Sequence, residues 1–348
     1  MTPPRPPRPS QRSTPSSAVR PSSPKAPADP YALNPNPEVV DPRWLLKALA
    51  VILLAALVCG YLTLCVLFYQ GEWQLVLHPS RSTPAPASIA DSPFEIIQFG
   101  LKASATPQLT GWWLPAAPGS RYAASTVLYL TSGDGSLADA QSAAIPTLAA
   151  LHTAGINVFA FDYRGYGQSL STHPNQRRMQ QDADLAWQYL TGLRSLPPSQ
   201  IVLFGTGVGA ALATELAAQH PQIPALILQN PRPGIFDSVS TDPRTKLLPL
   251  RLLFHDRFEI TQPLSTLATP KLFLLCETPH PADKNLPALQ DLIHRAATPK
   301  VNANLHPADF DGPLYREEIT RFLDQYLPTP PVISQPQSSI ASPLPLMR

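Results

Sequence analysis

The clearest chemical pattern lies in residues 201–212, where four apolar residues run into Gly205-Thr206-Gly207-Val208-Gly209 and then into an Ala-rich stretch. The apolar run predicts a buried strand, and the Ala-rich stretch predicts a helix. A sharp strand-to-helix corner of the form Gly-x-Ser-x-Gly exposes a serine hydroxyl for nucleophilic attack. Here Gly207 stands at the position of the serine. The corner is therefore present, but its attacking oxygen is missing.

Thr206 carries the hydroxyl nearest to that position. We consider it a weak candidate nucleophile, because neighbouring side chains at a tight corner point in different directions. The spacing of Gly205, Gly207 and Gly209 is wrong for a dinucleotide-binding loop. No phosphate loop or metal-ligand spacing competes with this interpretation, so we expect no cofactor and no metal.

Strands and helices alternate along the chain from Phe94. Period-two alternation in Phe94–Leu101 and Leu109–Leu114 predicts an antiparallel pair. Further strands are expected at 125–130, 156–161, 201–204, 225–228, 271–276 and 301–305, and helices at 145–154, 179–190, 210–218, 286–296 and 319–326. We expect residues 231–270 to be irregular. The alternation predicts an α/β protein with a mainly parallel sheet covered on both faces, whose active site lies at the carboxyl ends of the strands.

A hydrophobic segment precedes this alternating region. No charged residue occurs from Ala48 to Tyr69, a length that reaches ~33 Å as a helix and suffices for a hydrocarbon core of ~30 Å. Aromatic and basic residues at both ends match interfacial anchors: Trp44, Lys47, Tyr69 and Trp73. The segment has no polar face, so we predict one transmembrane helix and a protein partnered with the lipid bilayer.

Basic residues are concentrated before the predicted span: Arg5, Arg8, Arg12, Arg20, Lys25, Arg43 and Lys47. The first positive residue after it is Arg81. The positive-inside rule then places the N-terminus in the cytoplasm and the large domain on the extracytoplasmic side. A cleaved signal peptide fits less well, because the region before the span is long and no small-x-small site follows closely. A lipoprotein signal is also disfavoured, since bulky Val58 and Leu64 precede the two cysteines of the span.

Composition sets the remaining boundaries. Proline is concentrated at both ends of the chain, and both ends lack the apolar residues that a core requires. We therefore predict a disordered Pro-rich tail at 1–43, the transmembrane helix at 44–70, a connector at 71–92, the folded domain at 93–327 and a disordered Pro/Ser-rich tail at 328–348. The N-terminal tail is interpreted as solvated, with docking to an aromatic groove as the alternative.

Charge and cysteine content exclude some function classes. The net charge of +2 gives no indication of nucleic-acid binding. Cys276 is the only cysteine after the span, so no disulfide can form within the domain. We interpret Cys276 as a buried strand residue rather than a nucleophile.

Several segments resemble the α/β-hydrolase superfamily, and in particular its membrane-anchored, serine-aminopeptidase-like branch. Leu109–Pro115 is similar to an early strand of that branch, Phe161–Ser169 to the loop after its fourth strand, and Leu250–Phe258 to a short segment before its seventh strand. The resemblance covers about residues 70–327. It implies the α/β-hydrolase fold, a mostly parallel doubly wound sheet with helices on both faces, and hydrolysis of ester or peptide bonds by a serine.

The resemblance also implies an acid after the seventh strand and a histidine base after the last strand. Pro279 stands where family members carry Asp, while Glu277 is out of register and Asp283 lies several residues late. His306 is a weak candidate for the base, and the register leaves open whether Ala308 holds that position instead. We therefore expect no oriented acid–base pair.

The oxyanion hole implied by the resemblance combines the backbone N–H of Val208 with a donor from the loop that contains Ser132 and Gly133. We assign these three residues to a ligand pocket and oxyanion loop. Asp134 in the same loop would oppose negative charge.

Asp162 and Arg164 belong to the loop Asp-Tyr-Arg-Gly-Tyr-Gly. Arg164 can bridge Asp162 or loop carbonyls with its several donors, so we assign both residues a structural role, with a clamp for a substrate anion as the alternative.

Two hypotheses follow. In the first, the chain is a single-pass membrane protein whose hydrolase domain has lost Ser-based catalysis and acts as a binding or scaffolding module for a small acyl or peptide ligand or for a protein partner. In the second, it is an active hydrolase of ester or peptide bonds with a non-standard catalytic constellation built on Thr206 or on a water activated by His306.

Overall fold

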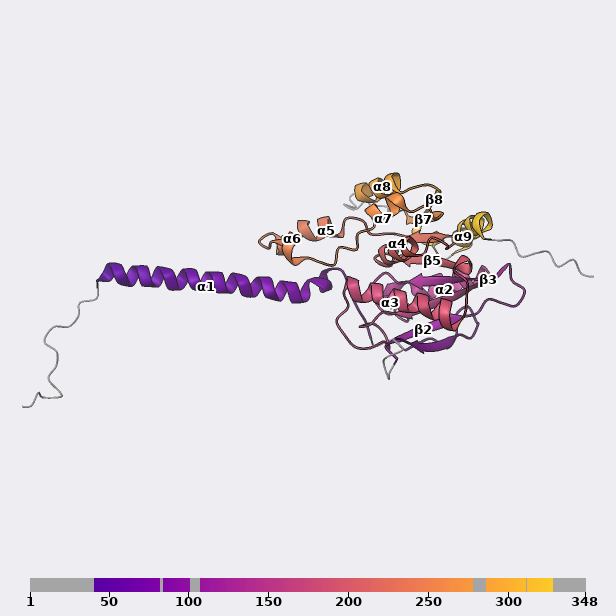
Figure 1. Cartoon of the computed structure of the whole chain (residues 1–348), viewed down its shortest axis with the longest axis horizontal. Coiled ribbons are helices and arrows are strands. Elements are labelled where there is room, and N and C mark those ends of the chain that lie inside the picture. Colours follow the sequence, from indigo (N-terminus) through magenta and orange to yellow (C-terminus); the bar gives the residue numbers. More distant parts are fainter. Residues whose placement is uncertain (1–40, 82–83, 101–106, 278–285, 311, 328–348) are drawn as a thin grey trace, which may run out of the picture. The chain divides into compact units, whose positions relative to one another are not determined.

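The computed structural model describes residues 41–81, 84–100, 107–277, 286–310 and 312–327. Both predicted tails lie outside these residues, apart from the short stretch 41–43. An eight-stranded sheet in the order β1-β2-β4-β3-β5-β6-β7-β8 organises the folded part (Figure 1). Its strands are β1 (Glu95–Phe99), β2 (Leu109–Leu114), β3 (Tyr122–Leu130), β4 (Ile156–Asp162), β5 (Ile201–Thr206), β6 (Leu226–Gln229), β7 (Lys271–Cys276) and β8 (Lys300–Leu305).

The pairing of these strands confirms the predicted sheet. β1 pairs antiparallel with β2, with Ile97 opposite Gly111, and β2 pairs antiparallel with β4. All pairs from β4 through β3, β5, β6 and β7 to β8 are parallel. The carboxyl ends of β3, β5, β6, β7 and β8 therefore meet at one edge of the sheet, where an active site of this class lies.

The α-helices are α1 (Pro42–Gly71), α2 (Ala144–Thr153), α3 (Gln176–Gln188), α4 (Gly209–Gln219), α5 (Ile235–Thr241), α6 (Leu250–Leu253), α7 (Thr261–Thr266), α8 (Leu286–Arg295) and α9 (Pro313–Tyr326). Short 3₁₀ segments occur at Glu72–Leu75, Ala140–Ser142, Pro198–Gln200, Pro243–Thr245 and Pro307–Asp309, and a π-helical turn at Tyr189–Leu193. Residues 231–270 were expected to be irregular, but they contain α5, α6 and α7. These helices have seven residues or fewer, too few for a periodic pattern to be recognised.

Helices cover both faces of the sheet, as predicted. Ile201 and Leu203 of β5 belong to a core shared with α3, α4, α7 and α8, whereas Val202 and Phe204 belong to a core shared with α2 and α9. Alternate residues of a strand point to opposite faces, which explains why β5 is apolar throughout.

α1 is the one helix among the described residues that is long and apolar enough to cross a membrane. The chain divides into two compact units, Met1–Cys59 and Gly60–Arg348, so the last turns of α1 belong to the same unit as the sheet. Within that unit, Tyr69 packs edge-on against His255, with ring centroids 5.4 Å apart. Glu72 accepts a hydrogen bond from the backbone N–H of His255 at 2.9 Å. These contacts fix the end of the helix on the segment between β6 and β7.

Candidate active site

The glycine-rich corner joins β5 to α4 at the carboxyl edge of the sheet. Gly207 has a φ of +55°, in the left-handed region, and Val208 precedes the first residue of α4. A Cβ on Gly205 would lie 2.4 Å from the Gly209 carbonyl oxygen, and a Cβ on Gly209 would lie 2.3 Å from the Thr131 carbonyl oxygen. Both flanking glycines are therefore required by close backbone approach, and the tight corner predicted from the sequence is present.

The space beside Gly207 is filled by the loop that follows β3. A Cβ placed on Gly207 would lie 2.9 Å from Cβ of Ser132 and 3.2 Å from both its Cα and its carbonyl oxygen. Contacts under about 3 Å between such carbon atoms require a shift of the neighbour, and here much of the neighbour is backbone. The corner thus lacks a serine and also lacks the room that a serine side chain would need.

The backbone N–H of Val208 points to the same loop. It donates to the Ser132 carbonyl oxygen at 3.4 Å, a long hydrogen bond that turns this amide toward a protein oxygen. The amide of Gly207 donates to the Gln229 carbonyl oxygen at 3.1 Å. Both corner amides therefore have protein acceptors, and an incoming oxyanion would have to displace Ser132 from Val208.

An ion pair joins the loops on either side of the corner. Asp134 follows β3 and Arg232 follows β6, and these strands are the two neighbours of β5 in the sheet. The Arg232 guanidinium donates to the Asp134 carboxylate at 2.6 Å. Nδ1 of His78 lies 2.9 Å from the other oxygen of Asp134. The negative charge expected to oppose an oxyanion is thus paired with the Arg232 cation beside the corner.

Gly133 anchors this loop from two further directions. Its carbonyl oxygen accepts from the backbone N–H of His78 at 2.9 Å and from the Tyr166 hydroxyl at 3.0 Å. The amide of Gly135 donates to the His78 carbonyl oxygen at 2.8 Å. The connector that follows α1 is therefore hydrogen-bonded to the loop that fills the corner. Sequence reasoning did not identify His78 or Arg232, because neither belongs to a local motif.

Comparison with known proteins agrees with this fold. Residues 136–270 match the family described as "Serine aminopeptidase, S33". The uncharacterised protein Rv2307c of Mycobacterium tuberculosis is 28% identical over 292 residues, which cover 80% of this chain and 96% of that protein. The α/β-hydrolase domain-containing protein WAV2 of Arabidopsis thaliana is 28% identical over 182 residues, covering 52% of this chain and 57% of that protein. A crystal structure of the Pyrococcus furiosus esterase Pf2001 superposes with a TM-score of 0.56 at 16% identity, covering 72% of this chain and 100% of the other. This chain has the α/β-hydrolase fold, and its residues 136–270 match a family of serine aminopeptidases.

In an α/β-hydrolase the acid and base follow the last strands of the sheet. Here Glu277 follows β7 and His306 follows β8, and Nδ1 of His306 lies 3.2 Å from Oε2 of Glu277. Adjacent parallel strands thus bring into contact two residues that the sequence analysis had weighed separately. Nδ1 is also the nitrogen that contacts the acid in a Ser-His-Asp triad. Both side chains are open to solvent, at 47% exposed for Glu277 and 74% for His306.

The other positions considered for the acid and the base give no further candidate. Pro279 and Asp283 lie outside the described residues. Ala308, the alternative to His306, is exposed within the short turn Pro307–Asp309 and carries no titratable group.

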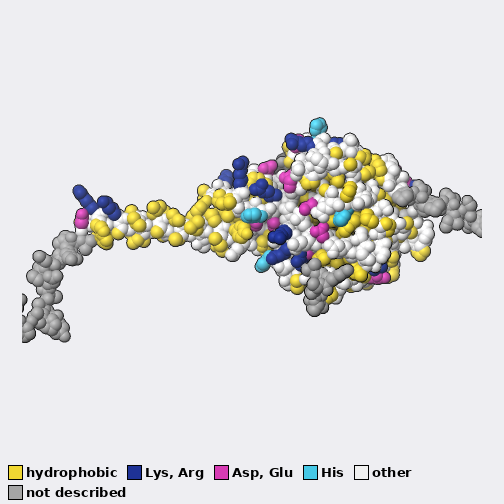
Figure 2. All heavy atoms as spheres, viewed as in Figure 1, with side chains coloured by type: hydrophobic (Ala, Val, Ile, Leu, Met, Phe, Trp, Pro, Cys, Tyr) yellow, Lys and Arg dark blue, Asp and Glu magenta, His cyan; other side chains and the backbone are white. Residues whose placement is uncertain are grey.

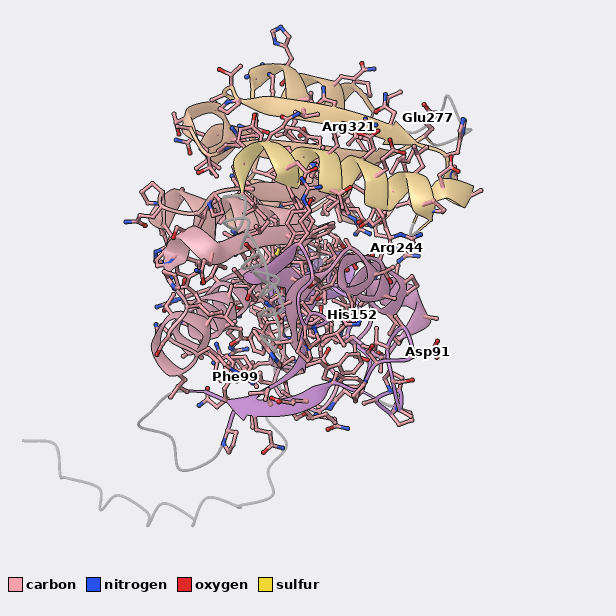
Figure 3. The ribbon with its side chains drawn as sticks, turned by 90° about the vertical axis from the view of Figure 1, so that its right-hand side faces the viewer. Asp91, Phe99, His152, Arg244, Glu277 and Arg321 are labelled. Atoms are coloured by element: carbon pink, nitrogen blue, oxygen red, sulfur yellow. The ribbon has the colours of Figure 1, made fainter. Side chains whose placement is uncertain are left out.

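Figure 3 shows Glu277, which follows β7, and Phe99 of β1 on opposite sides of the domain, as the strand order requires.

Thr206, the hydroxyl nearest to the missing serine, is buried at the end of β5. It is two residues beyond Phe204, so strand alternation directs its side chain to the face covered by α2 and α9. The nucleophile of this fold instead stands above the edge of the sheet at the following residue.

Asp162 and Arg164 do not pair with each other. Arg164 Nε donates to the Asp182 carboxylate of α3 at 2.5 Å, and the Arg164 amide donates to the same carboxylate at 2.8 Å. Asp162 instead accepts from the backbone N–H of Leu137 at 2.7 Å. Burial raises the pKa of Asp162, whereas the hydrogen bond from Leu137 and the charge of Arg81 lower it. The net result is a pKa of about 7. Burial likewise raises the pKa of Asp182 to about 6, although Arg164 opposes the change.

Cys276 is the last residue of β7, as predicted, but it is half-buried rather than buried, because it lies at the open end of the strand. Among the described residues, no cluster of three or more His, Cys, Asp and Glu side chains could hold a metal ion. Two surface hollows lie away from the corner. One of about 460 Å³ is lined by residues 240–252, and one of about 700 Å³ by residues of α7, α8 and their surroundings.

Proposed function

We propose that this chain is a single-pass membrane-anchored member of the α/β-hydrolase superfamily that lacks Ser-based catalysis and acts as a binding or scaffolding module. One observation carries the proposal: a Cβ at Gly207 would lie 2.9 Å from Cβ of Ser132. A nucleophile at this corner needs both a hydroxyl and an open approach for substrate, and the corner offers neither.

Two further observations support this proposal. The Val208 amide, which would stabilise an oxyanion, donates to Ser132 instead. The ion pair between Asp134 and Arg232 joins the loops that flank the corner. A protein of this kind would use the surface around the closed corner for contact with a small acyl or peptide ligand or a partner protein.

The proposed membrane anchor rests on α1. Its residues 48–69 carry no charge, and no residue of the helix is buried. A soluble protein rarely exposes so large an apolar surface. The excess of basic residues before the helix favours a cytoplasmic N-terminus and an extracytoplasmic domain.

A second candidate function is favoured by the contact between His306 and Glu277. This pair has the arrangement of a general base with its orienting acid, and it could activate a water molecule for hydrolysis of an ester or peptide bond. Its exposure argues against that role, because water screens the interaction and leaves the imidazole without a defined substrate approach.

Steady-state hydrolysis by the purified full chain separates the two candidates. We would assay p-nitrophenyl esters and aminoacyl-p-nitroanilides with the unaltered protein, with His306→Ala and with the matched control His294→Ala, which removes an exposed histidine from α8. Our proposal predicts the same background rate for all three proteins. Turnover that His306→Ala abolishes and His294→Ala preserves would establish the second function.

A further inference from the structure

The segment between β6 and β7 carries exposed leucines beside basic residues. We call residues 243–252 the basic leucine tip. Leu247 is 81% exposed and Leu252 is 74% exposed. The tip also carries three exposed basic residues, Arg244, Lys246 and Arg251. Figure 2 shows Lys and Arg side chains gathered beside hydrophobic ones at the end of the domain nearest α1. Large exposed apolar side chains with cations at their border are typical of a surface that contacts a membrane.

The tip lies directly against α1. The hydroxyl of Tyr61 donates to the carbonyl oxygen of Leu247 at 3.2 Å. The edge-on packing of Tyr69 on His255 and the bond from His255 to Glu72, just after α1, hold the following part of the segment at the end of the same helix. Contacts at Tyr61 and at Tyr69 therefore define the position of the tip along the helix axis.

That position lies within the proposed span. The charge-free run extends to Tyr69, and Tyr61 precedes it by eight residues. Eight residues of α-helix advance ~12 Å along the axis. If the run Ala48–Tyr69 crosses the bilayer, Leu247 sits beside a residue well below the membrane surface.

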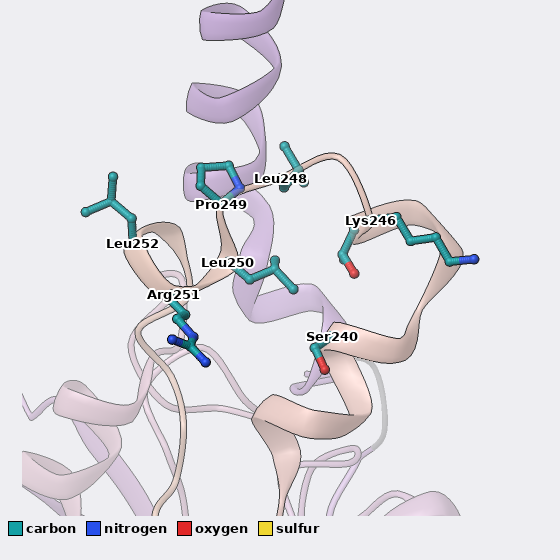
Figure 4. Close-up of a pocket in the computed structure, with 8 residues that line it drawn as sticks. Ser240, Lys246, Leu248, Pro249, Leu250, Arg251 and Leu252 are labelled. Carbon is teal, nitrogen blue, oxygen red and sulfur yellow. The ribbon is translucent and has the colours of Figure 1, made fainter.

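The directions of the side chains agree with this depth. Figure 4 shows Leu252 and Leu248 pointing along α1 away from the body of the domain, whereas Arg251 points back toward it. Lys246 points outward, away from α1. Leucines would thus enter the acyl region, and long basic side chains would reach the phosphate groups.

We propose that the basic leucine tip inserts into the lipid leaflet on the domain's side of the membrane, with Leu247 and Leu252 among the acyl chains and with Arg244, Lys246 and Arg251 at the phosphates of the headgroups. This inference rests on the proposed membrane span of α1. The domain would then contact the membrane through the basic leucine tip as well as through α1.

Site-directed spin labelling tests the insertion in the full chain. The native cysteines would be replaced (Cys59→Ala, Cys65→Ala, Cys276→Ala), and a nitroxide would be attached at Leu247→Cys, at Leu252→Cys or at the control Leu193→Cys. Leu193 has the same exposed fraction as Leu252, 74%, but lies on the π-helical turn after α3. The proteins would be reconstituted in phosphatidylcholine vesicles with and without phosphatidylglycerol.

We expect the nitroxides at 247 and 252 to collide more often with oxygen than with an aqueous nickel chelate, and the nitroxide at 193 to show the reverse. Phosphatidylglycerol should increase the difference, because anionic headgroups attract the three cations. Equal aqueous accessibility at 247, 252 and 193 would overturn the proposal. Shielding of 247 and 252 from both reagents, with spin–spin broadening between labelled copies, would also overturn it and would indicate packing against a second copy of the chain.

A photoreactive lipid provides a second measurement on the unaltered protein, which avoids any folding defect of the variants. A phosphatidylcholine with a diazirine on its acyl chain should label peptides that contain residues 247–252 and should spare those that contain residue 193. Labelling of α1 without labelling of the tip would refute only the insertion. Absence of labelling in α1, together with extraction by carbonate, would instead refute the proposed span.

Discussion

Replacement of Gly207 by alanine should destabilise the domain more than replacement of any glycine that is merely in the left-handed region. Two costs add at this position. A residue with a Cβ at a φ of +55° costs about 1–2 kcal/mol. The contact of 2.9 Å with Cβ of Ser132 adds an overpacking cost of about 1–3 kcal/mol. The expected loss in the free energy of unfolding is therefore about 2–5 kcal/mol.

Gly119 provides the matched control. Its φ is +77°, and a Cβ there would meet no atom within 4 Å. Gly119→Ala should therefore show the backbone cost alone, about 1–2 kcal/mol. Removing the opposing Cβ with Ser132→Gly should recover most of the additional cost in the Gly207→Ala background, which a double-mutant cycle would measure as a coupling of about 1–3 kcal/mol.

The assay is denaturant unfolding of the full chain in detergent micelles, followed by the fluorescence of the domain's tryptophans. The reasoning is refuted if Gly207→Ala is no more destabilising than Gly119→Ala, because the corner would then have room for a side chain. Gly207→Ser should lose as much stability as Gly207→Ala and should gain no esterase activity, since Ser132 occupies the approach to its hydroxyl.

Two further predictions concern buried carboxylates. The pKa of Asp162 is raised from 3.8 to about 7, so the folded state binds its proton more tightly than the unfolded state does, and the stability of the domain should fall as the pH rises between about 4 and 7. Asp162→Asn keeps an oxygen for the Leu137 amide and should flatten this dependence in unfolding measured across that pH range, and an unchanged slope would contradict the assignment. Arg164→Ala should destabilise the domain by about 3 kcal/mol at pH 8, because it removes the ion-pair partner of the buried Asp182 carboxylate, and by less at pH 5, where protonation removes that charge. The control is the exposed Arg177, which lies on α3 together with Asp182. Equal effects of Arg177→Ala and Arg164→Ala in the same unfolding measurement would exclude a specific role for the ion pair between Arg164 and Asp182.

The parts of the fold that local sequence patterns determine were predictable. β5 is apolar on both faces and α4 is rich in alanine, so the strand, the corner and the helix all follow from neighbouring residues. The same holds for the antiparallel pair β1 and β2, which the alternation of apolar and polar residues identified, although β2 is buried throughout. The helices between β6 and β7 were missed because each has two turns or fewer.

The closure of the corner could not be predicted, because it depends on contacts between distant segments. Glycine at position 207 indicated a missing nucleophile, but the sequence did not reveal that Ser132 fills the vacated space. The charge of Asp134 was recognised, whereas its partner Arg232 comes from a loop with no motif. Glu277 and His306 were judged by their register against a family pattern, and the pairing of β7 with β8 brings them together despite that register.

The most direct test of the central claim is reaction of the purified full chain with a fluorophosphonate, followed by intact-mass measurement and peptide mapping. The absence of an attacking oxygen at the corner predicts an unmodified mass after prolonged reaction, under conditions that label an active serine esterase completely. A stoichiometric adduct on Ser132 or Thr206 that disappears in His306→Ala would contradict it, and would show that the corner holds a working nucleophile.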